Sequence, residues 1–204
     1  FFGIHSSVFS PITRPIMITF IAENIAAMQA GETIPHFFTA GASSAFFGFT
    51  GCGISIGCVI ACMLSKNASY KKIGRVSLFP ALFGINEPIL FGAPIILYPI
   101  MFMPLVFGGA IIGTLPMFFM HWGWLAKPVF DPPYVGVFLE GFLTNGDWHS
   151  ILANALQLVL AVLLYWPFFK IMERQQNNKK QKEETKNIFS KEEEDLLDDL
   201  GLDF

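Results

Sequence analysis

The 204-residue chain is 53% hydrophobic, contains 23 phenylalanines and has a formal net charge of −3. Residues 1–169 carry six basic and six acidic side chains, whereas residues 170–204 carry seven basic and ten acidic ones. This distribution excludes a soluble globular domain, a nucleic-acid-binding protein and a disordered chain for residues 1–169, and it indicates a membrane protein with a polar tail.

The chain opens with Phe-Phe-Gly-Ile-His, without Met and without a preceding basic segment. We therefore expect no signal peptide and interpret the chain as the C-terminal part of a longer protein. His5 is either a packed core residue or a ligand-binding one, and the prolines Pro11 and Pro15 follow it as helix breakers. Arg14 is either a loop anchor or a group that attracts an anion.

Residues 42–64 form an uncharged stretch long enough to cross a membrane, and we predict a spanning helix there. The basic residues that follow place the next loop in the cytoplasm: Lys66, Lys71, Lys72 and Arg75. The stretch is rich in glycine, which indicates either close helix packing or a surface beside a sugar: Gly48, Gly51, Gly53 and Gly57. Its cysteines have no nearby His or acid, so we expect buried structural residues and no metal site.

Residues 76–126 contain a single charged residue, Glu87, and six prolines. Proline breaks helices, and broken backbone at membrane depth is tolerated where it packs in protein or lines a cavity. We therefore predict a re-entrant hairpin over residues 76–99 and one membrane crossing over residues 100–126.

Residues 127–147 are predicted to be a loop, whose turn signals include Asn145-Gly146-Asp147. Residues 148–169 are predicted to span the membrane and to end in the cytoplasm, where Lys170 follows. The organisation is thus a membrane-embedded domain over residues 1–170 and a polar acidic cytoplasmic tail over residues 171–204. We expect the tail to be disordered, with a short acidic helix as the alternative.

Glu87 is the strongest candidate for chemistry, because charged groups at membrane depth are costly and usually functional. It lies in Gly84-Ile85-Asn86-Glu87-Pro88, where a proline break brings freed backbone groups to a carboxylate. This combination suits hydrogen bonding to a polyhydroxyl ligand. The alternative is an acid at a helix end near the membrane surface. No phosphate-binding Gly-Lys-Ser/Thr loop is present, so a nucleotide-driven pump is not indicated, and we expect no cofactor.

Five motifs then point to one family: Gly3-Ile4-His5, Ala30-Gly31-Glu32 with Pro35-His36, residues 83–89, residues 91–95 and residues 163–169. Because these motifs occur in this order and at similar spacing, the chain resembles the membrane IIC component of the bacterial sugar phosphotransferase system, of the lactose/cellobiose (β-diglucoside) type. The resemblance covers roughly residues 1–172. It implies an all-α polytopic membrane protein with transmembrane helices, re-entrant hairpins and broken helices.

The resemblance also implies a function. The chain would belong to a homodimeric, multi-pass permease in the lipid of a bacterial cell membrane, binding a β-linked disaccharide such as cellobiose or lactose. A phosphocysteine on a separate cytoplasmic IIB protein, with IIA and HPr upstream, would phosphorylate the sugar. Catalysis would fall to Glu87 and His5, and sugar binding to His5, Gly84, Asn86 and Glu87. No nucleic acid is implied.

Three departures from the family pattern bear on which sugar is bound. Gly84 stands where the family usually has Asn, Tyr98 precedes Pro99 where Asn is common, and residues 130–134 read Phe-Asp-Pro-Pro-Tyr where Pro-Trp-Thr is expected. Two other functions compete with the phosphotransferase reading. One is a sugar transporter not coupled to phosphorylation, and the other is a non-transporting membrane sensor or scaffold that works through its tail.

Overall fold

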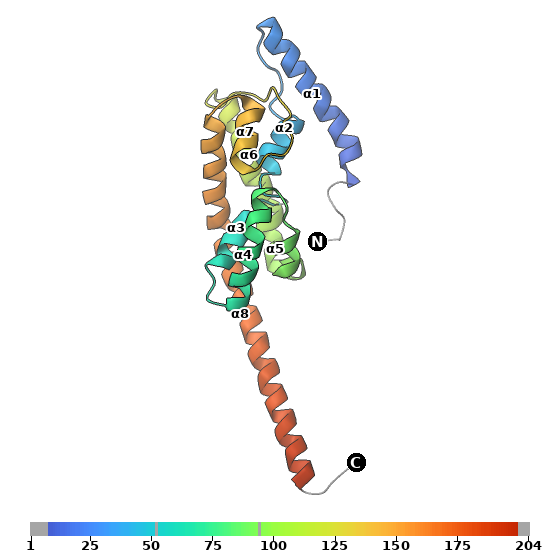
Figure 1. The fold of residues 1–204 in the computed structure, drawn as a ribbon, viewed down its shortest axis with the longest axis vertical. Coiled ribbons are helices and arrows are strands. Elements are labelled where there is room, and N and C mark those ends of the chain that lie inside the picture. The colour runs from blue at the N-terminus through green and yellow to red at the C-terminus, as the bar shows by residue number, and fades with distance from the viewer. Residues whose placement is uncertain (1–7, 52, 94, 200–204) are drawn as a thin grey trace. The chain divides into compact units, whose positions relative to one another are not determined.

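The computed structural model describes residues 8–51, 53–93 and 95–199, and the chain divides into two compact units, residues 1–169 and 170–204. All regular secondary structure in the described residues is helical, and they contain no strand (Figure 1). In the first half lie α1 (Ser10–Ala30), α2 (Ala40–Ala42), the π-helical turn η2 (Ser43–Phe47), α3 (Ile56–Met63), α4 (Ala68–Leu82) and α5 (Glu87–Gly92). The 3₁₀ turns η3 (Ile95–Leu97) and η4 (Pro99–Met101) follow, then the π-helical turn η5 (Pro104–Gly108), α6 (Gly109–His121), α7 (Val137–Asn145) and α8 (His149–Asp199).

Within the described part of the chain, two helical stretches are long and apolar enough to cross a membrane, and both match predicted spans. The first is Pro99–His121, which combines η4, η5 and α6, and the second is His149–Lys179 within α8. The two prolines at the start of α1 do not break it. Pro11 occupies the first turn, where no N–H is needed, and Pro15 lies inside the helix.

The prediction of a continuous helix over residues 42–64 is wrong. The helix stops after Phe47 and resumes at Ile56, and between them lie residues 48–51 and 53–55, which we call the glycine break; Cys52 lies outside the described residues. The backbone has positive φ at Thr50, Gly51, Gly53 and Ile54, a conformation that is incompatible with a helix and that glycine adopts most readily. The glycines here therefore serve backbone conformation as well as packing.

Close helix packing is seen at Gly57, Cys58 and Cys62 of α3. A Cβ at Gly57 would overlap the Ala161 carbonyl, so α3 approaches α8 at backbone distance. Cys58 and Cys62, on the same helix, are fully buried and face protein, as expected of structural residues.

The side chain of Gln157 on α8 bonds backbone carbonyls of two other helical segments, η2 and α6. Its Nε2 donates to the Ile112 carbonyl at 2.9 Å and to the Phe46 carbonyl at 3.1 Å. The Ile112 carbonyl lacks its usual partner because the residue four positions later is Pro116. Phe46 lies at the end of η2, where the helix stops. One fully buried amide thus satisfies two backbone groups that helix defects leave open.

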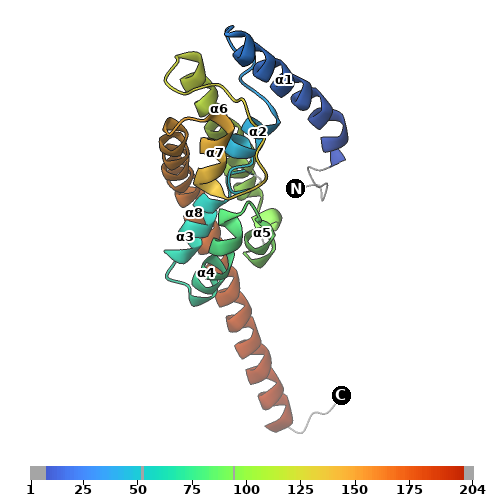
Figure 2. The same ribbon diagram turned by 45° about the horizontal axis from the view of Figure 1, so that its top comes forward.

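Residues 76–99 reverse direction as predicted, although the first arm is longer than expected. It is α4, which starts at Ala68, and α5 returns beside it (Figures 1 and 2). Gly92 of α5 approaches Ile73 of α4 so closely that a Cβ there would lie 3.0 Å from the Ile73 side chain. The hairpin geometry is therefore present, and its position relative to a membrane stays a prediction.

Residues 127–147 differ from the predicted loop in their second half, where α7 forms. The helix is short, but it packs against α2 and η2 and buries Val137. This tertiary packing stabilises a helix that would be marginal by itself. The turn at its end is confirmed: Gly146 is left-handed with φ +64°.

Asp147 fixes that turn. Its carboxylate accepts the N–H groups of Ala126 at 2.9 Å and His149 at 3.0 Å, and it bonds His149 Nδ1 at 2.6 Å. Burial alone would raise the pKa of Asp147, but these hydrogen bonds outweigh burial and lower it. This set of contacts makes Asp147 and His149 structural residues of the turn.

In the structure α8 continues as a helix to Asp199, and the disorder of the tail stays a prediction. A helix that is already nucleated in an apolar span extends at little cost, and the tail is rich in Lys, Glu and Gln, which favour helix. Near the start of the tail, Lys170 pairs with Glu173 at 2.9 Å.

Candidate functional site

The end of the α4–α5 hairpin presents Asn86 and Glu87. The N–H groups of Gly84 and Ile85 donate back to the Ala81 and Pro80 carbonyls at 3.1 and 3.0 Å, so α4 ends in a tight turn. Gly84 allows this turn through its φ of +73°. Glu87 is then the first residue of α5, with Pro88 directly after it. A carboxylate in the first turn of a helix is electrostatically favourable.

The glycine break packs directly against this tip. A Cβ at Gly51 would lie 2.8 Å from both Asn86 Cγ and the Gly84 carbonyl oxygen. Glycine is therefore needed at position 51 twice, for its φ of +85° and for the close approach. Asn86 is buried by this contact, whereas Glu87 is exposed. Two broken segments, far apart in sequence, thus meet where the candidate carboxylate lies.

Tyr134 reaches the same tip from the extended segment 127–136. A Cβ at Gly84 would overlap the Tyr134 hydroxyl, so the phenol lies directly against that glycine. Burial, and secondarily the charge of Glu140, raises the pKa of Tyr134 to about 12, so the hydroxyl stays protonated at neutral pH. It is therefore available as a hydrogen-bond donor beside the hairpin tip.

Glu140 on α7 is an acid that the sequence analysis did not single out. Only 2% of it is exposed, and its Oε1 has no hydrogen-bond partner among the described residues. The helix lies outside the two stretches that are long enough to span a membrane. Burial, and then the charge of Asp131, raises the pKa of Glu140 to about 7. The signal was the one used for Glu87, a single acid in an apolar run.

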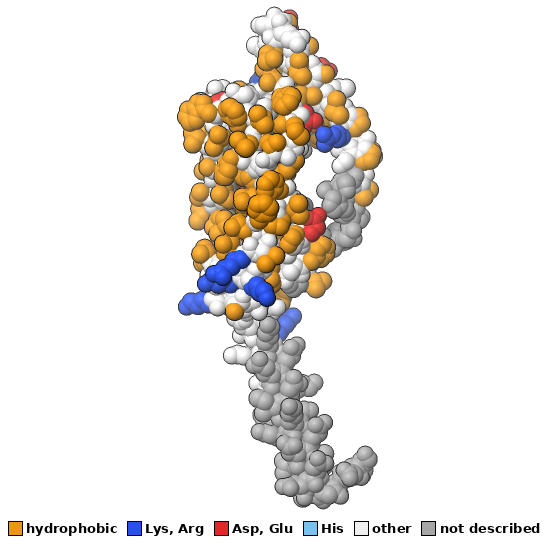
Figure 3. Space-filling view, viewed as in Figure 1, with side chains coloured by type: hydrophobic (Ala, Val, Ile, Leu, Met, Phe, Trp, Pro, Cys, Tyr) orange, Lys and Arg blue, Asp and Glu red, His pale blue; other side chains and the backbone are white. Residues whose placement is uncertain are grey.

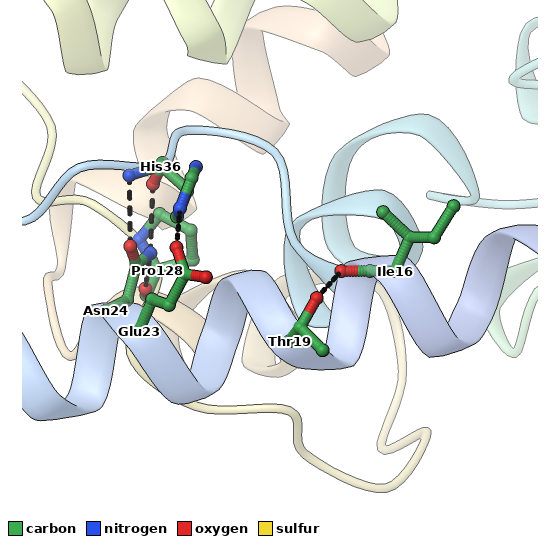
Figure 4. A network of polar contacts seen from close by, with 6 residues as sticks. All are labelled: Ile16, Thr19, Glu23, Asn24, His36 and Pro128. Atoms are coloured by element: carbon green, nitrogen blue, oxygen red, sulfur yellow. Dashed lines mark hydrogen bonds and ion pairs between the residues drawn. The ribbon is translucent and has the colours of Figure 1, made fainter.

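Polar contacts hold the extended segment against α1. Asn24, fully buried, donates to the carbonyls of His36 at 2.9 Å and Pro128 at 2.7 Å and accepts the His36 N–H at 3.0 Å (Figure 4). The His36 ring bonds the Glu23 carboxylate. Farther along α1, Arg14 pairs with Asp131 at 3.3 Å. These contacts make Arg14 an anchor for the extended segment, one of its two predicted roles.

Residues 53–57 read Gly-Ile-Ser-Ile-Gly, a spacing also found around nucleophilic serines of hydrolases. The context here is different, because these residues close the glycine break and begin α3. Ser55 is fully buried and donates to the Thr50 carbonyl at 3.0 Å. Ser55 is therefore a structural residue of the break.

Three of the four predicted site residues, Gly84, Asn86 and Glu87, gather at the hairpin tip. His5 lies outside the described residues, so its place beside Glu87 stays a prediction. The contacts from Gly51 and Tyr134 were not predicted.

The family profile "Phosphotransferase system, EIIC" matches residues 1–109, more than half of the 204-residue chain. The chain belongs to this family. It is similar to the transporter ChbC, the IIC component from the N,N′-diacetylchitobiose-specific phosphotransferase system, with a TM-score of 0.81 and 27% identity over 88% of this chain and 43% of that one. The expected fold class, an all-helical membrane protein with broken helices, is thereby confirmed.

Curated relatives agree. The chain is 34% identical to the galactose-specific EIIC component of Lactococcus lactis over 84% of this chain and 39% of that protein. It is 29% identical to the lichenan permease IIC component of Bacillus subtilis, covering 85% of this chain and 39% of the relative. With the lactose-specific EIICB component of Staphylococcus aureus it shares 33% identity over 84% of this chain and 31% of the relative. The chain thus spans less than half the length of these EIIC relatives.

Gly84 and Tyr134, both in segments singled out in the sequence, are in contact. A side chain at position 84 would overlap the phenol, so glycine at this position makes room for Tyr134 beside the hairpin tip.

Proposed function

We propose that this chain forms the sugar-binding part of a phosphotransferase-system permease that binds a β-linked disaccharide such as cellobiose or lactose. The observation that carries the proposal is the meeting of the hairpin tip with the glycine break, which presents Glu87 beside buried Asn86. Broken helices of this kind supply backbone groups and polar side chains for substrates of membrane transporters. Several relatives are named for lactose or oligo-β-mannoside, which supports a saccharide ligand.

In this proposal the chemistry depends mainly on positioning. Glu87 accepts a hydrogen bond from the sugar hydroxyl and takes its proton as the hydroxyl attacks phosphorus. The cysteine of the IIB protein is the leaving group, so the phosphoryl group moves from sulfur to the sugar oxygen. His5 polarises the same hydroxyl. The product is anionic, and once Glu87 has given up the proton, to solvent or to the departing thiolate, repulsion from its carboxylate favours product release.

The proposed partners follow from this chemistry. The phosphoryl donor is a cytoplasmic IIB phosphoprotein, charged through IIA and HPr, and the permease works as a homodimer in the membrane. Cys58 and Cys62 are fully buried, which supports a donor thiolate on another polypeptide. The α8 tail lies in the cytoplasm, as the basic residues Lys170 and Arg174 at its start favour.

Replacing Glu87 with Gln tests the role of its carboxylate. The amide keeps the shape and loses the charge and the base, so sugar affinity falls by about one to two decades, as the loss of a charge-assisted hydrogen bond predicts. Phosphoryl transfer falls further, because a base acts only in the transfer step. Binding of radiolabelled cellobiose and IIB-dependent phosphorylation in membrane vesicles measure the two effects.

The matched control is Glu32→Gln, the same change at an exposed acid that follows α1. It leaves both binding and transfer at wild-type values. If Glu87→Gln kept normal phosphoryl transfer, the role of Glu87 as the base would be contradicted. If Cys58→Ser abolished phosphoryl transfer, the donor thiolate would not belong to the IIB protein. Free sugar accumulating in cells that lack the phosphoryl carriers would favour the uncoupled transporter instead.

A further inference from the structure

A polar cavity lies between α1 and the π-helical turn η2, apart from the hairpin tip. Its volume is about 260 Å³, and the α1 side contributes Ser10, Thr13 and Arg14 while the η2 side contributes Ser43, Ser44 and Gly48. The space-filling view shows a hollow between α1 and the rest of the first unit (Figure 3). Four of these lining residues carry hydroxyl groups, and π-helical turns such as η2 are frequent at functional sites.

The lining suits a neutral polyhydroxyl group better than an ion. The charge of Arg14 is already matched by Asp131 at 3.3 Å, so the cavity carries no unbalanced charge from this residue. The Thr13 hydroxyl donates to the Phe9 carbonyl at 3.2 Å and the Ser44 hydroxyl to the Ala40 carbonyl at 3.4 Å, which leaves both hydroxyl oxygens as acceptors. The Arg14 N–H groups are donors. A sugar ring needs both kinds of group.

The cavity is linked to the hairpin tip through the glycine break. Gly48 lines the cavity, and its carbonyl accepts the Gly51 N–H at 2.7 Å. Gly51 is the residue in contact with Asn86, next to Glu87. One irregular segment therefore borders both the cavity and the hairpin tip.

We infer that this cavity binds the second ring of the disaccharide, the ring that is not phosphorylated; the inference rests on the proposed function. Its volume is slightly below the range of about 300–1,000 Å³ that holds whole drug-sized ligands, and it suits one hexose ring. The hydroxyls of Ser43 and Ser44 and the guanidinium of Arg14 contact this ring, whereas the ring beside Glu87 receives the phosphoryl group. Ser43, Ser44 and Arg14 thus select two-ring over one-ring sugars.

The test compares a two-ring and a one-ring probe, cellobiose and methyl β-glucoside, in the Ser43→Ala/Ser44→Ala double variant. Loss of two neutral hydrogen bonds weakens cellobiose binding about tenfold. Methyl β-glucoside binding and its phosphorylation stay at wild-type values. Each single variant gives a smaller loss for cellobiose alone, which keeps the test usable if the double variant is poorly folded. Ser69→Ala, at an exposed serine of α4, is the control and changes neither ligand.

The outcomes separate this inference from the proposed function. Equal losses for both probes, or no loss for either, would overturn the second-ring site while leaving the role of Glu87 standing. Glu87→Gln weakens both probes if the proposed function holds. If the wild-type protein binds neither probe, the proposed function fails and the cavity assignment fails with it.

Discussion

At Glu140 the surroundings change the chemistry of a single side chain. The carboxyl group is buried on α7, and its pKa is raised to about 7 by burial and by the charge of Asp131. The neighbouring Tyr134 remains protonated. Because the pKa of Glu140 in the folded protein is higher than its value of 4.5 in the unfolded chain, folding favours the protonated, neutral carboxyl group.

We therefore expect stability to fall as pH rises. Below pH 4.5 Glu140 is protonated in both the folded and the unfolded chain. The loss of folding stability caused by its ionisation grows between pH 4.5 and about 7 and is constant above that. The full penalty is on the order of 3 kcal/mol. Glu140→Gln removes this titration, so its thermal unfolding temperature in detergent exceeds that of the wild type at pH 8 and approaches it at pH 5.

Glu32→Gln, at an exposed acid, provides the comparison and leaves the pH profile of unfolding unchanged. A wild-type unfolding temperature that rises from pH 5 to pH 8, with Glu140→Gln following the same course, would show that Glu140 is ionised in the fold.

Among the structural elements, the glycine break has the largest effect on the site. It replaces the central part of a predicted membrane helix, and Gln157 of α8 holds its preceding turn by bonding the Phe46 carbonyl. Gly51 of the break packs on Asn86, and Gly48 of the break lines the polar cavity. Its conformation therefore determines the geometry of both candidate binding places.

Gly51→Ala tests the break directly. The substitution places a methyl group 2.8 Å from Asn86 Cγ in a backbone with φ +85°, and left-handed backbone costs an L-residue about 1–2 kcal/mol. Because Asn86 must move, cellobiose affinity falls by an order of magnitude or more.

Gly31→Ala separates the contact from the backbone strain. Gly31 has a similar φ of +72°, and a Cβ there meets nothing within 4 Å. This variant loses some thermal stability and keeps normal sugar affinity. Equal affinity losses in the two variants would mean that strain alone, and not displacement of Asn86, explains the effect.

At the scale of the whole molecule, the chain separates into a membrane domain and a helical tail, with α8 running through both ranges. The first unit contains the hairpin tip, the glycine break and the polar cavity. Of the two units, sugar transport in our proposal depends on the first and not on the tail.

Deleting residues 176–204 should therefore leave cellobiose uptake within about twofold of wild type, as measured in cells with the complete phosphotransferase system. The deletion retains the Lys170–Glu173 ion pair and the fully buried Met172. A truncation after Phe169 removes these groups as well, and we expect it to abolish uptake through loss of folded protein. Abolished uptake with normal protein levels in the shorter deletion would favour the sensor or scaffold function instead.

The apolar spans and the hairpin could be predicted from sequence because their signals are local. Long uncharged runs predicted spans over residues 100–126 and 148–169, which the apolar helices Pro99–His121 and His149–Lys179 match, and the prolines around Glu87 predicted the reversal between α4 and α5. Hydropathy and proline act on the backbone within a few residues, so their consequences are visible along the chain.

The helix break at residues 48–55, the helix α7 and the role of Glu140 depended on tertiary structure. A run of glycines is compatible with a packed helix or with left-handed backbone, and contacts to Asn86 and Leu105 from distant segments decide between them. Burial of Glu140 likewise requires α7 to pack against η2. The sequence by itself determined which segments are apolar, where the chain reverses and which acid stands at the tip. Tertiary structure alone decided how the broken segments meet, because close packing and burial are properties of contacts between residues far apart in the chain.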